Sequence, residues 1–416
     1  MSDPHPAPPA TSSSGESQQF PYWRRNLQVL PFNNLLCGIG FSVAFPFLPL
    51  MVRNLGVQQN LETWVGHMML AFYMAGFVAN PIWGGIADHY GRKLMVLRAS
   101  VGMGAFMLMV PFAATPLWFA FFFAMIGFFN GVVPAGMALL VANTPPGRIG
   151  TALSFAQSGA IVGHTIGPAV GSMLAVVVTQ PHHLFWVSGG LMMVASVLVA
   201  LFVREVKQLA PGKWRPEWIG GLRHIAAVPR MKPLYLLSMV FAMLWHGSTP
   251  VISIYMLDLL ERHPSGAEAY WIGAAALGLG VASVIALPVW GRLLDRFGPS
   301  RVLAISVGAS AATHLPLLVL DTPTALVIAR CAYGLCGTAM QPAILQLMRV
   351  HAPRGMDARA ISYSTSFQCL AMGLAPFVAG LIGPALGLRA YFALNIAIAV
   401  GGLALWAYSA RRNVEG

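Results

Sequence analysis

Long apolar runs recur along almost the whole chain, separated by short polar segments. Twelve runs are long enough to be helices, with expected bounds of 26–52, 63–86, 93–113, 116–142, 151–178, 184–203, 233–257, 269–291, 300–320, 323–348, 360–384 and 388–410. An α-helix needs about 20 mainly apolar residues to cross a bilayer. The pattern therefore predicts an all-α integral membrane protein with twelve transmembrane helices.

The composition leaves no room for a large soluble domain. Of the 416 residues, 57% are hydrophobic and only 9% are charged, whereas soluble domains carry about 25% charged residues. The net charge of +12 does not indicate a nucleic-acid partner, because the basic residues flank the apolar runs and form no stripe on a soluble face. Basic residues beside apolar runs are typical of the loops that join the spans of membrane proteins.

The distribution of Lys and Arg predicts the orientation in the membrane. Arg24 and Arg25 precede the first run, which places the N-terminus in the cytoplasm. If successive loops then lie on alternate sides of the membrane, only three of the 25 basic residues lie outside, namely Arg53, Arg262 and Arg389. Arg330 lies within a span. We expect a multi-pass protein of the inner (cytoplasmic) membrane, with both termini cytoplasmic.

Three polar segments lie outside the spans. Residues 1–22 are rich in Pro and Ser and have no apolar core, so we expect a disordered cytoplasmic tail and not a signal peptide. Residues 411–416 form a second cytoplasmic tail. The basic linker 204–232 carries Trp214, Trp218 and Leu222 at helical spacing. It is either an amphipathic helix on the inner membrane surface or an ordinary basic loop.

The chain repeats itself. Pro81-Ile82-Trp83-Gly84, followed by Asp88 and Gly91, recurs 207 residues later as Pro288-Val289-Trp290-Gly291, followed by Asp295 and Gly298. Further matches in three other blocks have nearly the same offset. The repeat predicts two six-helix bundles, 23–203 and 233–410, with a substrate site between them.

The first copy of the repeat has the sequence of a known signature. Gly84-Gly85-Ile86-Ala87-Asp88-His89-Tyr90-Gly91-Arg92-Lys93 resembles the loop between spans two and three of the major facilitator superfamily, with His89 at a usually basic position. The second copy contributes Gly291, Asp295, Arg296 and Gly298. The resemblance implies secondary transport by alternating access, with these residues in a gating loop.

A second motif lies in span five. Gly163-His164-Thr165-Ile166-Gly167-Pro168-Ala169-Val170-Gly171-Ser172 resembles the motif of proton-coupled antiporters among the twelve-helix drug exporters, with Ser172 in place of the last glycine. Gly163, Gly167 and Gly171 also suit close helix packing, and Pro168 disrupts one backbone hydrogen bond. The stretches Gly40–Leu50 and Trp83–Gly104 resemble the MdtG-type branch of these exporters.

The resemblance implies a function and leaves alternatives. It implies proton-coupled efflux of hydrophobic or amphipathic small molecules, driven by the proton gradient with no cofactor, by a protein that is expected to be a monomer in contact with membrane lipid. One alternative is a dedicated exporter of an endogenous metabolite such as a siderophore. A non-transporting membrane receptor or scaffold is an alternative of another class.

One family residue is replaced. Exporters of this group usually have an arginine in the outer part of span four, where alignment on Gly127 puts Phe123. The equivalent position of the second half is Arg330, about 10 Å from Pro323 at about 1.5 Å per residue. An arginine at this depth either faces the cavity and a partner or extends to the membrane surface. We take Arg330 as a candidate for proton coupling.

Two histidines are the other coupling candidates. No Asp or Glu lies in the middle of a predicted span, which argues against strong selection for permanent cations and favours neutral, amphipathic or anionic substrates. His164 in span five and His246 in span seven are then the obvious titratable groups, because histidine changes charge near physiological pH. The alternative for each is a neutral histidine that is hydrogen-bonded to a neighbouring helix.

Polar and aromatic residues within spans are candidates for lining the substrate cavity. They are Asn33, Asn34, Asn130, Gln157, Trp245, Gln341, Gln346 and Gln368. Each is equally compatible with a helix–helix hydrogen bond. The sequence has no phosphate-binding loop, no metal-ligand cluster and no nucleophile–base arrangement, so we expect neither an enzyme nor a metal site.

Overall fold

The computed structural model describes residues 20–145, 148–175, 177–178, 180–206, 231–262, 267–352 and 357–412. These residues form helices joined by short turns, and there is no β-strand among them. The predicted amphipathic segment of the linker and most of both predicted tails lie outside the described residues.

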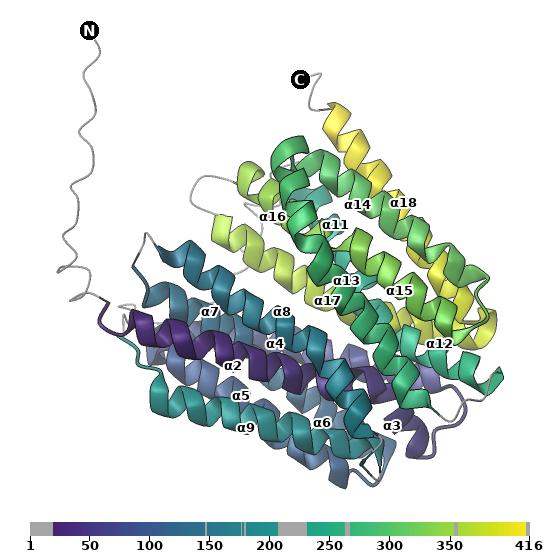
Figure 1. Ribbon diagram of the computed structural model, residues 1–416, viewed down its shortest axis with the longest axis horizontal. Coiled ribbons are helices and arrows are strands. Elements are labelled where there is room, and N and C mark those ends of the chain that lie inside the picture. Colours follow the sequence, from purple (N-terminus) through teal and green to yellow (C-terminus); the bar gives the residue numbers. More distant parts are fainter. Residues whose placement is uncertain are drawn as a thin grey trace.

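The first half contains the six predicted helical stretches (Figure 1). They are α2 (Trp23–Ala44) with η1 (Phe45–Phe47) and α3 (Leu48–Asn54), α4 (Leu61–Tyr90), α5 (Arg92–Met109) with η2 (Val110–Phe112), α6 (Pro116–Phe129) with α7 (Val132–Ala142), α8 (Ile149–Ala175), and η4 (Pro181–His183) with α9 (Leu184–Phe202).

The second half repeats this order. Its helices are α11 (Met231–Ala242) with η5 (Met243–Gly247) and α12 (Ser248–Arg262), α13 (Glu268–Phe297), α14 (Pro299–His314) with η6 (Pro316–Leu318), α15 (Pro323–Gly337) with α16 (Met340–His351), α17 (Asp357–Leu386), and α18 (Leu388–Arg412). Nine of the helical stretches in the described residues are long and apolar enough to cross a membrane. The other three predicted spans are α4, α8 and α15 with α16.

Several spans are interrupted, and in spans four and ten the interruption lies at equivalent places in the two halves. Span four stops after α6, where Gly131 has a φ of 129°, and resumes as α7. Span ten is likewise divided between α15 and α16. Span one contains the short 3-10 helix η1, and span seven contains η5, which is a π-helix. Interruptions of this kind free backbone groups and redirect side chains, and π-helical turns occur often at functional sites.

The signature motif is more helical than predicted. We expected a turn over residues 87–92, between the predicted helices 63–86 and 93–113, but α4 continues to Tyr90 and α5 begins at Arg92. Only Gly91, with a φ of 101°, lies between them. Gly298, with a φ of 79°, separates α13 from α14 in the same way. Glycine adopts this left-handed conformation without a steric penalty, so a single residue can turn the chain between two long helices.

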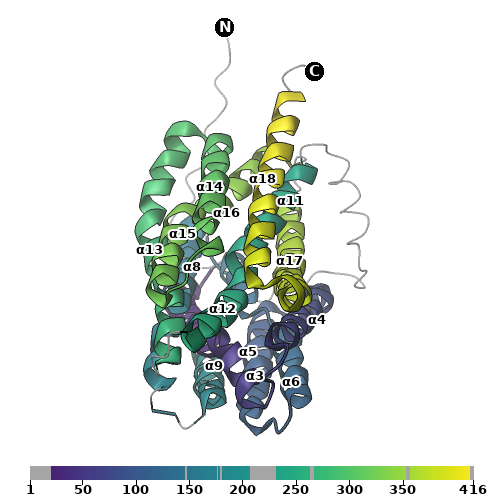
Figure 2. The same ribbon diagram turned by 90° about the vertical axis from the view of Figure 1, so that its right-hand side faces the viewer.

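Among the described residues, the contacts between the two halves are concentrated toward one end of the molecule. In Figure 1 the bundles meet at the lower right, around α3 and α12, and diverge toward the start of α2 and the end of α18. Figure 2 shows the first half below the second. The main contacts between the halves pair α4 with α17 and α8 with α13, and α12 packs against η1 and α3. We call the end with α3 and the beginning of α4 the closed end, and the opposite one the open end.

Close backbone approach holds the closed end together. A Cβ atom on Gly66 of α4 would lie 2.5 Å from the Pro376 carbonyl oxygen of α17, and one on Gly380 would lie 2.6 Å from the Glu62 carbonyl oxygen. The hydroxyl of Thr63 donates to the Gly380 carbonyl at 2.7 Å. Because glycine has no side chain, α4 and α17 pack backbone against backbone, as is common between membrane helices.

Candidate functional site

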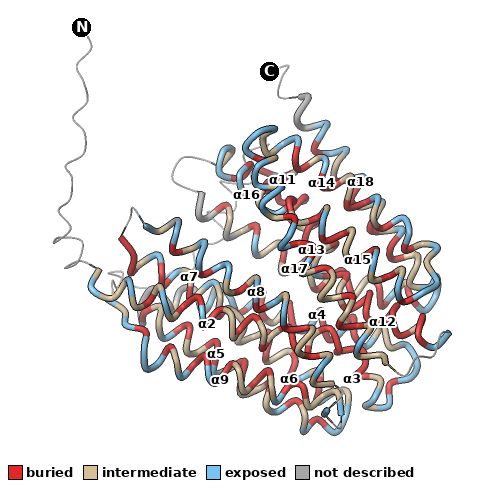
Figure 3. Tube along the Cα trace, viewed as in Figure 1, coloured by how far each residue is buried: buried red, intermediate tan, exposed pale blue. Residues whose placement is uncertain are grey.

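Two histidines of different halves lie near each other. His164 lies near the middle of α8 and His246 in η5, and they are close enough for their charges to interact. Both residues are exposed, and buried, intermediate and exposed positions alternate along α8 (Figure 3). The structure therefore brings together two candidates that the sequence places 82 positions apart.

The local contacts orient the His164 ring. Its Nδ1 lies 2.8 Å from the Ala160 carbonyl oxygen, one turn earlier in α8. A carbonyl only accepts hydrogen bonds, so in the neutral ring Nδ1 carries the proton and Nε2 is left to accept another. The Phe41 ring packs 5.8 Å away, centroid to centroid. The geometry thus leaves one titratable nitrogen available to the space between the halves.

The glycines of the span-five motif pack α8 against α2. A Cβ atom on Gly163 would lie 2.9 Å from the Ile39 nitrogen, and one on Gly167 would lie 3.0 Å from the Ile39 carbonyl oxygen. Gly171 meets the backbone of Val43 in the same way. The predicted role of these glycines in close helix packing is confirmed. Pro168 lies within α8, as expected.

The residue that departs from the motif contacts the other half. Ser172 stands where the motif usually has its last glycine, and its hydroxyl lies 3.1 Å from the carbonyl oxygens of Pro168 and Ala269. Ala269 belongs to the turn that begins α13, so Ser172 links α8 to the second half at the closed end. The sequence reasoning did not anticipate this contact.

The signature segment has a partner that the sequence reasoning missed. The Glu205 carboxylate, just after α9, accepts hydrogen bonds from the backbone N–H groups of Arg92 at 2.7 Å and Lys93 at 3.0 Å. A carboxylate at a helix N-terminus is favourable because it meets unpaired N–H groups and the positive end of the helix dipole. The sequence signal was an acidic residue directly after span six, which we had assigned to the linker. Glu205 therefore ties the start of α5 to the end of α9.

The remaining signature residues lie at the open end. Gly84 and Asp88 belong to the last turns of α4, and the surroundings of the Asp88 carboxylate lie outside the described residues. The second-half counterparts Gly291, Asp295 and Arg296 lie in the final turns of α13. The predicted gating role of this segment remains a prediction.

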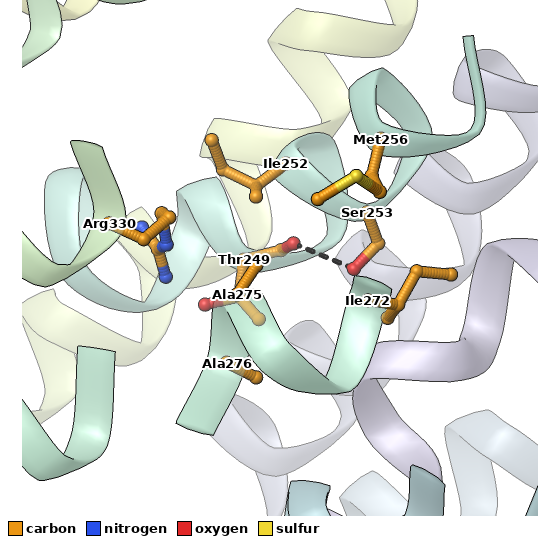
Figure 4. Close-up of a pocket in the computed structure, with 8 residues that line it drawn as sticks. All are labelled: Thr249, Ile252, Ser253, Met256, Ile272, Ala275, Ala276 and Arg330. Carbon is orange, nitrogen blue, oxygen red and sulfur yellow. Dashed lines mark hydrogen bonds between the residues drawn. The ribbon is translucent and has the colours of Figure 1, made fainter. Parts of the chain in front are cut away.

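Arg330 is buried, so the interpretation that it extends to the membrane surface is wrong. Its residue exposure is 3%, and its guanidinium carbon lies 5.8 Å from the Tyr333 ring centroid. Its Nε atom has no hydrogen-bond partner. Within the described part of the chain no carboxylate pairs with it, although a partner was expected. The side chain instead points from α15 into a small pocket beside α12 and α13 (Figure 4).

Phe123, at the equivalent place in the first half, has different surroundings. It is fully buried, and its ring packs 5.0 Å from that of Phe72 and 5.1 Å from that of Phe45. An aromatic cluster thus replaces the charge at this position. The two halves share a backbone plan but differ here in chemistry.

Some predicted cavity residues are packing residues in this conformation. Asn33 and Asn34 are fully buried, and the Asn34 amide donates to the Ala156 carbonyl at 3.1 Å. The Gln368 amide donates to the Ser364 hydroxyl at 3.3 Å, and that hydroxyl donates to Ser238 of α11 at 2.8 Å. For Asn34 and Gln368 the structure favours the alternative of a helix–helix hydrogen bond, whereas the Asn33 amide donates within its own helix, to the Asn34 Oδ1 atom at 3.4 Å.

Other predicted cavity residues lie nearer the histidines. Gln157 is exposed and precedes His164 by seven positions, which is two helical turns on the same face of α8. Trp245 is half-buried next to His246, and its ring lies 5.4 Å from that of Tyr333. Gln157 and Trp245 are therefore the predicted lining residues best placed to meet a ligand there.

The last three predicted lining residues do not form one surface. Asn130 accepts a 2.7 Å hydrogen bond from the Gly131 N–H and so shapes the break in span four. Gln341 and Gln346 are both exposed on α16. Five positions apart, they lie on different faces of that helix. Among the described residues, the four cysteines are free and no group of three or more potential metal ligands comes together.

An ion-pair cluster joins the halves at the closed end. Arg53 of α3 bonds to Glu268 of α13 at 2.5 Å and lies 3.7 Å from Glu261 of α12. A neighbouring cluster, in which Arg262 and Arg389 contact Asp321, lies within the second half. The sequence placed these arginines on one side of the membrane but contained no signal for their partners.

Comparison with known sequences identifies the family of this chain. The Major Facilitator Superfamily matches residues 32–261 and again residues 234–415. The multidrug resistance protein MdtG of Serratia proteamaculans is 31% identical over 380 residues, which cover 90% of each chain. MdtG of Escherichia fergusonii is 29% identical over 416 residues, covering 97% of this chain and 98% of the relative. The predicted resemblance to the MdtG-type branch is confirmed.

Solved structures show the same fold at low sequence identity. The nucleoside transporter NupG has a TM-score of 0.75 at 12% identity, covering 93% of this chain and 98% of NupG. The human organic anion transporter MFSD10 has a TM-score of 0.68 at 16% identity, covering 92% and 99%. With the paired bundles, the repeated motif and the match over both halves, this chain belongs to the major facilitator superfamily of membrane transporters.

Proposed function

We propose that this transporter is a proton-coupled exporter of hydrophobic or amphipathic small molecules that works by alternating access. The observation that carries the proposal is the proximity of His164 and His246, which belong to different halves and lie near the middle of their spans. No predicted span holds a mid-membrane carboxylate, so these rings are the proton-binding groups best placed for coupling. The names of the MdtG relatives support a role in multidrug resistance.

The distribution of basic residues supports a sidedness for the two ends. Arg24, Arg25 and Arg204 lie toward the open end, whereas Arg53, Arg262 and Arg389 lie at the closed end. We infer that the protein lies in the inner membrane and that its open end faces the cytoplasm. The conformation is then the inward-facing one, in which an exporter loads its substrate.

The proposed cycle follows from the contacts that must exchange. Substrate binds from the cytoplasm between the halves, beside His164 and His246. Rocking of the bundles then separates α4 from α17 and α8 from α13, and closes the open end. A proton that reaches the histidines from outside accompanies the return to the inward-facing state.

Flux in proteoliposomes tests the function directly. The purified full-length chain is reconstituted, a pH gradient is imposed, and transport of a panel of amphipathic dyes and drugs is followed with and without a protonophore. Proton-dependent transport of several unrelated compounds supports the proposal. A siderophore in the panel addresses the dedicated-exporter alternative, which is favoured if that compound alone moves. Absence of flux for every compound would favour the receptor or scaffold alternative.

Breaking the ion pair at the closed end should weaken the inward-facing state. We expect Arg53→Gln to raise the outward-facing population by up to about fivefold, because a partly exposed ion pair contributes about 0.2–1 kcal/mol. The population is measured from the distance between labels on introduced non-natural amino acids at Gln59 and Leu386, which lie at the closed end of different halves.

Arg262→Gln is the matched control for this change. Arg262 is a closed-end arginine whose carboxylate partners, Asp258 and Asp321, belong to its own half. Its loss should leave the distance distribution unchanged. If both variants shift the distribution equally, the effect comes from general surface charge, and the Arg53 ion pair does not specifically stabilise the inward-facing state.

A further inference from the structure

Arg330 is a buried cation without a counter-ion. The residue is only 3% exposed, its Nε atom is unpartnered, and the titratable groups near it are Tyr333, Cys331, Tyr391 and His314. None of these is a carboxylate. A charge that is removed from water without an opposite charge is strongly unfavourable. A structural role alone therefore gives no reason to retain arginine at this depth.

The pocket in front of Arg330 has the chemistry of an anion site. Thr249 and Ser253 of α12 contribute hydroxyl groups to its wall, and the rest is apolar (Figure 4). The apolar lining residues are Ile252, Met256, Ile272, Ala275 and Ala276. The Thr249 hydroxyl is held only by a long 3.4 Å bond to the Trp245 carbonyl, so it can turn and donate to an anion. Apolar walls strengthen the attraction between a cation and an anion, because they exclude water.

The pocket is small. Its space admits the centre of a water molecule over only about 10 Å³, which is enough for about one water-sized group. A chloride ion or one end of a carboxylate matches this size, whereas the body of a drug molecule does not. Any larger ligand must leave its main part outside.

The position of the pocket allows a larger ligand to keep its main part outside. Thr249 lies three residues beyond His246 in span seven, about one helical turn toward the closed end. Trp245 connects the two places, because its ring contacts that of Tyr333, the neighbour of Arg330. A molecule bound beside the histidines can therefore extend a substituent into the pocket. The α12 and α13 helices that line it also contact the first half, so the pocket borders the surface that separates during transport.

We propose that the Arg330 pocket binds a small anionic group, such as the carboxylate of an amphipathic acid carried between the halves. As a statement about transported substrates this rests on the proposed export function. As a statement about a binding site it rests on the buried guanidinium and its pocket alone. The guanidinium contacts the ligand and determines its charge, while the space beside the histidines accepts its apolar body.

The first experiment tests anion binding without transport. The purified full-length protein is titrated with sodium chloride or sodium acetate, and the variants are titrated in parallel, so that effects of ionic strength alone cancel in the comparison. We expect the melting temperature of the wild type to rise by about 2 °C or more near saturation. Arg330→Met should remove this rise and still fold, because methionine fills similar space without a buried charge. Arg262→Met, a change at an exposed arginine, should behave as wild type.

The second experiment asks whether the anion belongs to the substrate. Binding of 1-naphthylacetate is compared with binding of its neutral analogue 1-naphthylacetamide. We expect the wild type to bind the acid at least about tenfold more tightly. Arg330→Met should abolish this preference and leave the affinity for the amide unchanged.

The outcomes separate the site from the function. Equal loss of affinity for acid and amide, or unchanged anion stabilisation in Arg330→Met, would overturn the proposal. A response to chloride or acetate without any acid preference supports the site and identifies a free anion as its ligand. If the wild type prefers the acid but transports neither these compounds nor any compound of the dye and drug panel in proteoliposomes, the anion site stands and the proposed export function fails.

Discussion

Gly66→Val will abolish transport while the protein remains folded and present in the membrane. Gly66 lies where α4 meets α17, and a Cβ atom there would come within 2.5 Å of the Pro376 carbonyl oxygen and 3.0 Å of the Phe377 Cα atom. Neither backbone atom can move independently of its helix. A valine side chain therefore separates the halves at the closed end. We expect each bundle to fold, because the main helix contacts within the halves, such as α2 with α8 and α13 with α15, do not involve Gly66.

The expected product is a protein held in the outward-facing state. A membrane transporter of this fold must close each end in turn, so a variant that cannot close one end cannot complete the cycle. Flux should fall below about a tenth of the wild-type value, and the distance between labels at Gln59 and Leu386 should lengthen. Membrane abundance is measured in parallel.

Gly190→Val provides the control. Gly190 lies in α9, and an added Cβ atom there meets nothing within 4 Å. It changes helix composition in the same way without touching the interface between the halves. Normal flux in Gly66→Val at normal abundance would show that the transporter can close this end without the contact of α4 with α17.

His164→Gln and His246→Gln should each uncouple substrate movement from the proton gradient. Glutamine keeps polarity and hydrogen-bonding capacity but does not titrate between pH 5 and 8. We expect gradient-driven flux to fall by about tenfold or more, which corresponds to about 1.4 kcal/mol in a rate-limiting step. Exchange of substrate for substrate without a gradient should persist, because that reaction needs no proton.

The pH dependence gives a second readout of the same change. Wild-type flux should vary with pH, because the charge of a histidine depends on pH, and the variants should lose this variation. His183→Gln is the control, since that ring stacks on Trp186 of its own half, with centroids 4.5 Å apart. If His164→Gln and His246→Gln both keep the gradient-driven flux and the pH dependence of the wild type, the two histidines have no role in coupling.

Much of the fold could be predicted because the bilayer imposes a simple rule. Every backbone polar group in lipid must be satisfied within its own helix, so an apolar run of sufficient length determines a spanning helix. All twelve predicted runs coincide with helical stretches of the structure. The repeat around Asp88 and Asp295 likewise predicted two equivalent bundles, because residues needed for tight turns and close packing recur wherever the backbone plan recurs.

Helix ends and interruptions were less predictable. A turn was expected over residues 87–92 of the signature motif, yet only Gly91 leaves helical geometry. The breaks at Gly131 and in η5 gave no hydropathy signal, because the flanking residues remain apolar. Local composition determines that a segment spans the membrane, whereas packing against neighbouring helices decides where its backbone departs from the regular helix.

The candidate site shows the same division between sequence and structure. By itself, the sequence determined that the spans lack mid-membrane acids and hold His164, His246 and Arg330 as rare polar groups, since such residues are costly in lipid and stand out by composition. Only the tertiary structure decided that the histidines of different halves lie near each other, that Arg330 is buried without a counter-ion, and that Asn33 and Asn34 serve packing. The physical reason is that the depth of a residue follows from its position along one helix, whereas its partners follow from how helices distant in sequence pack together.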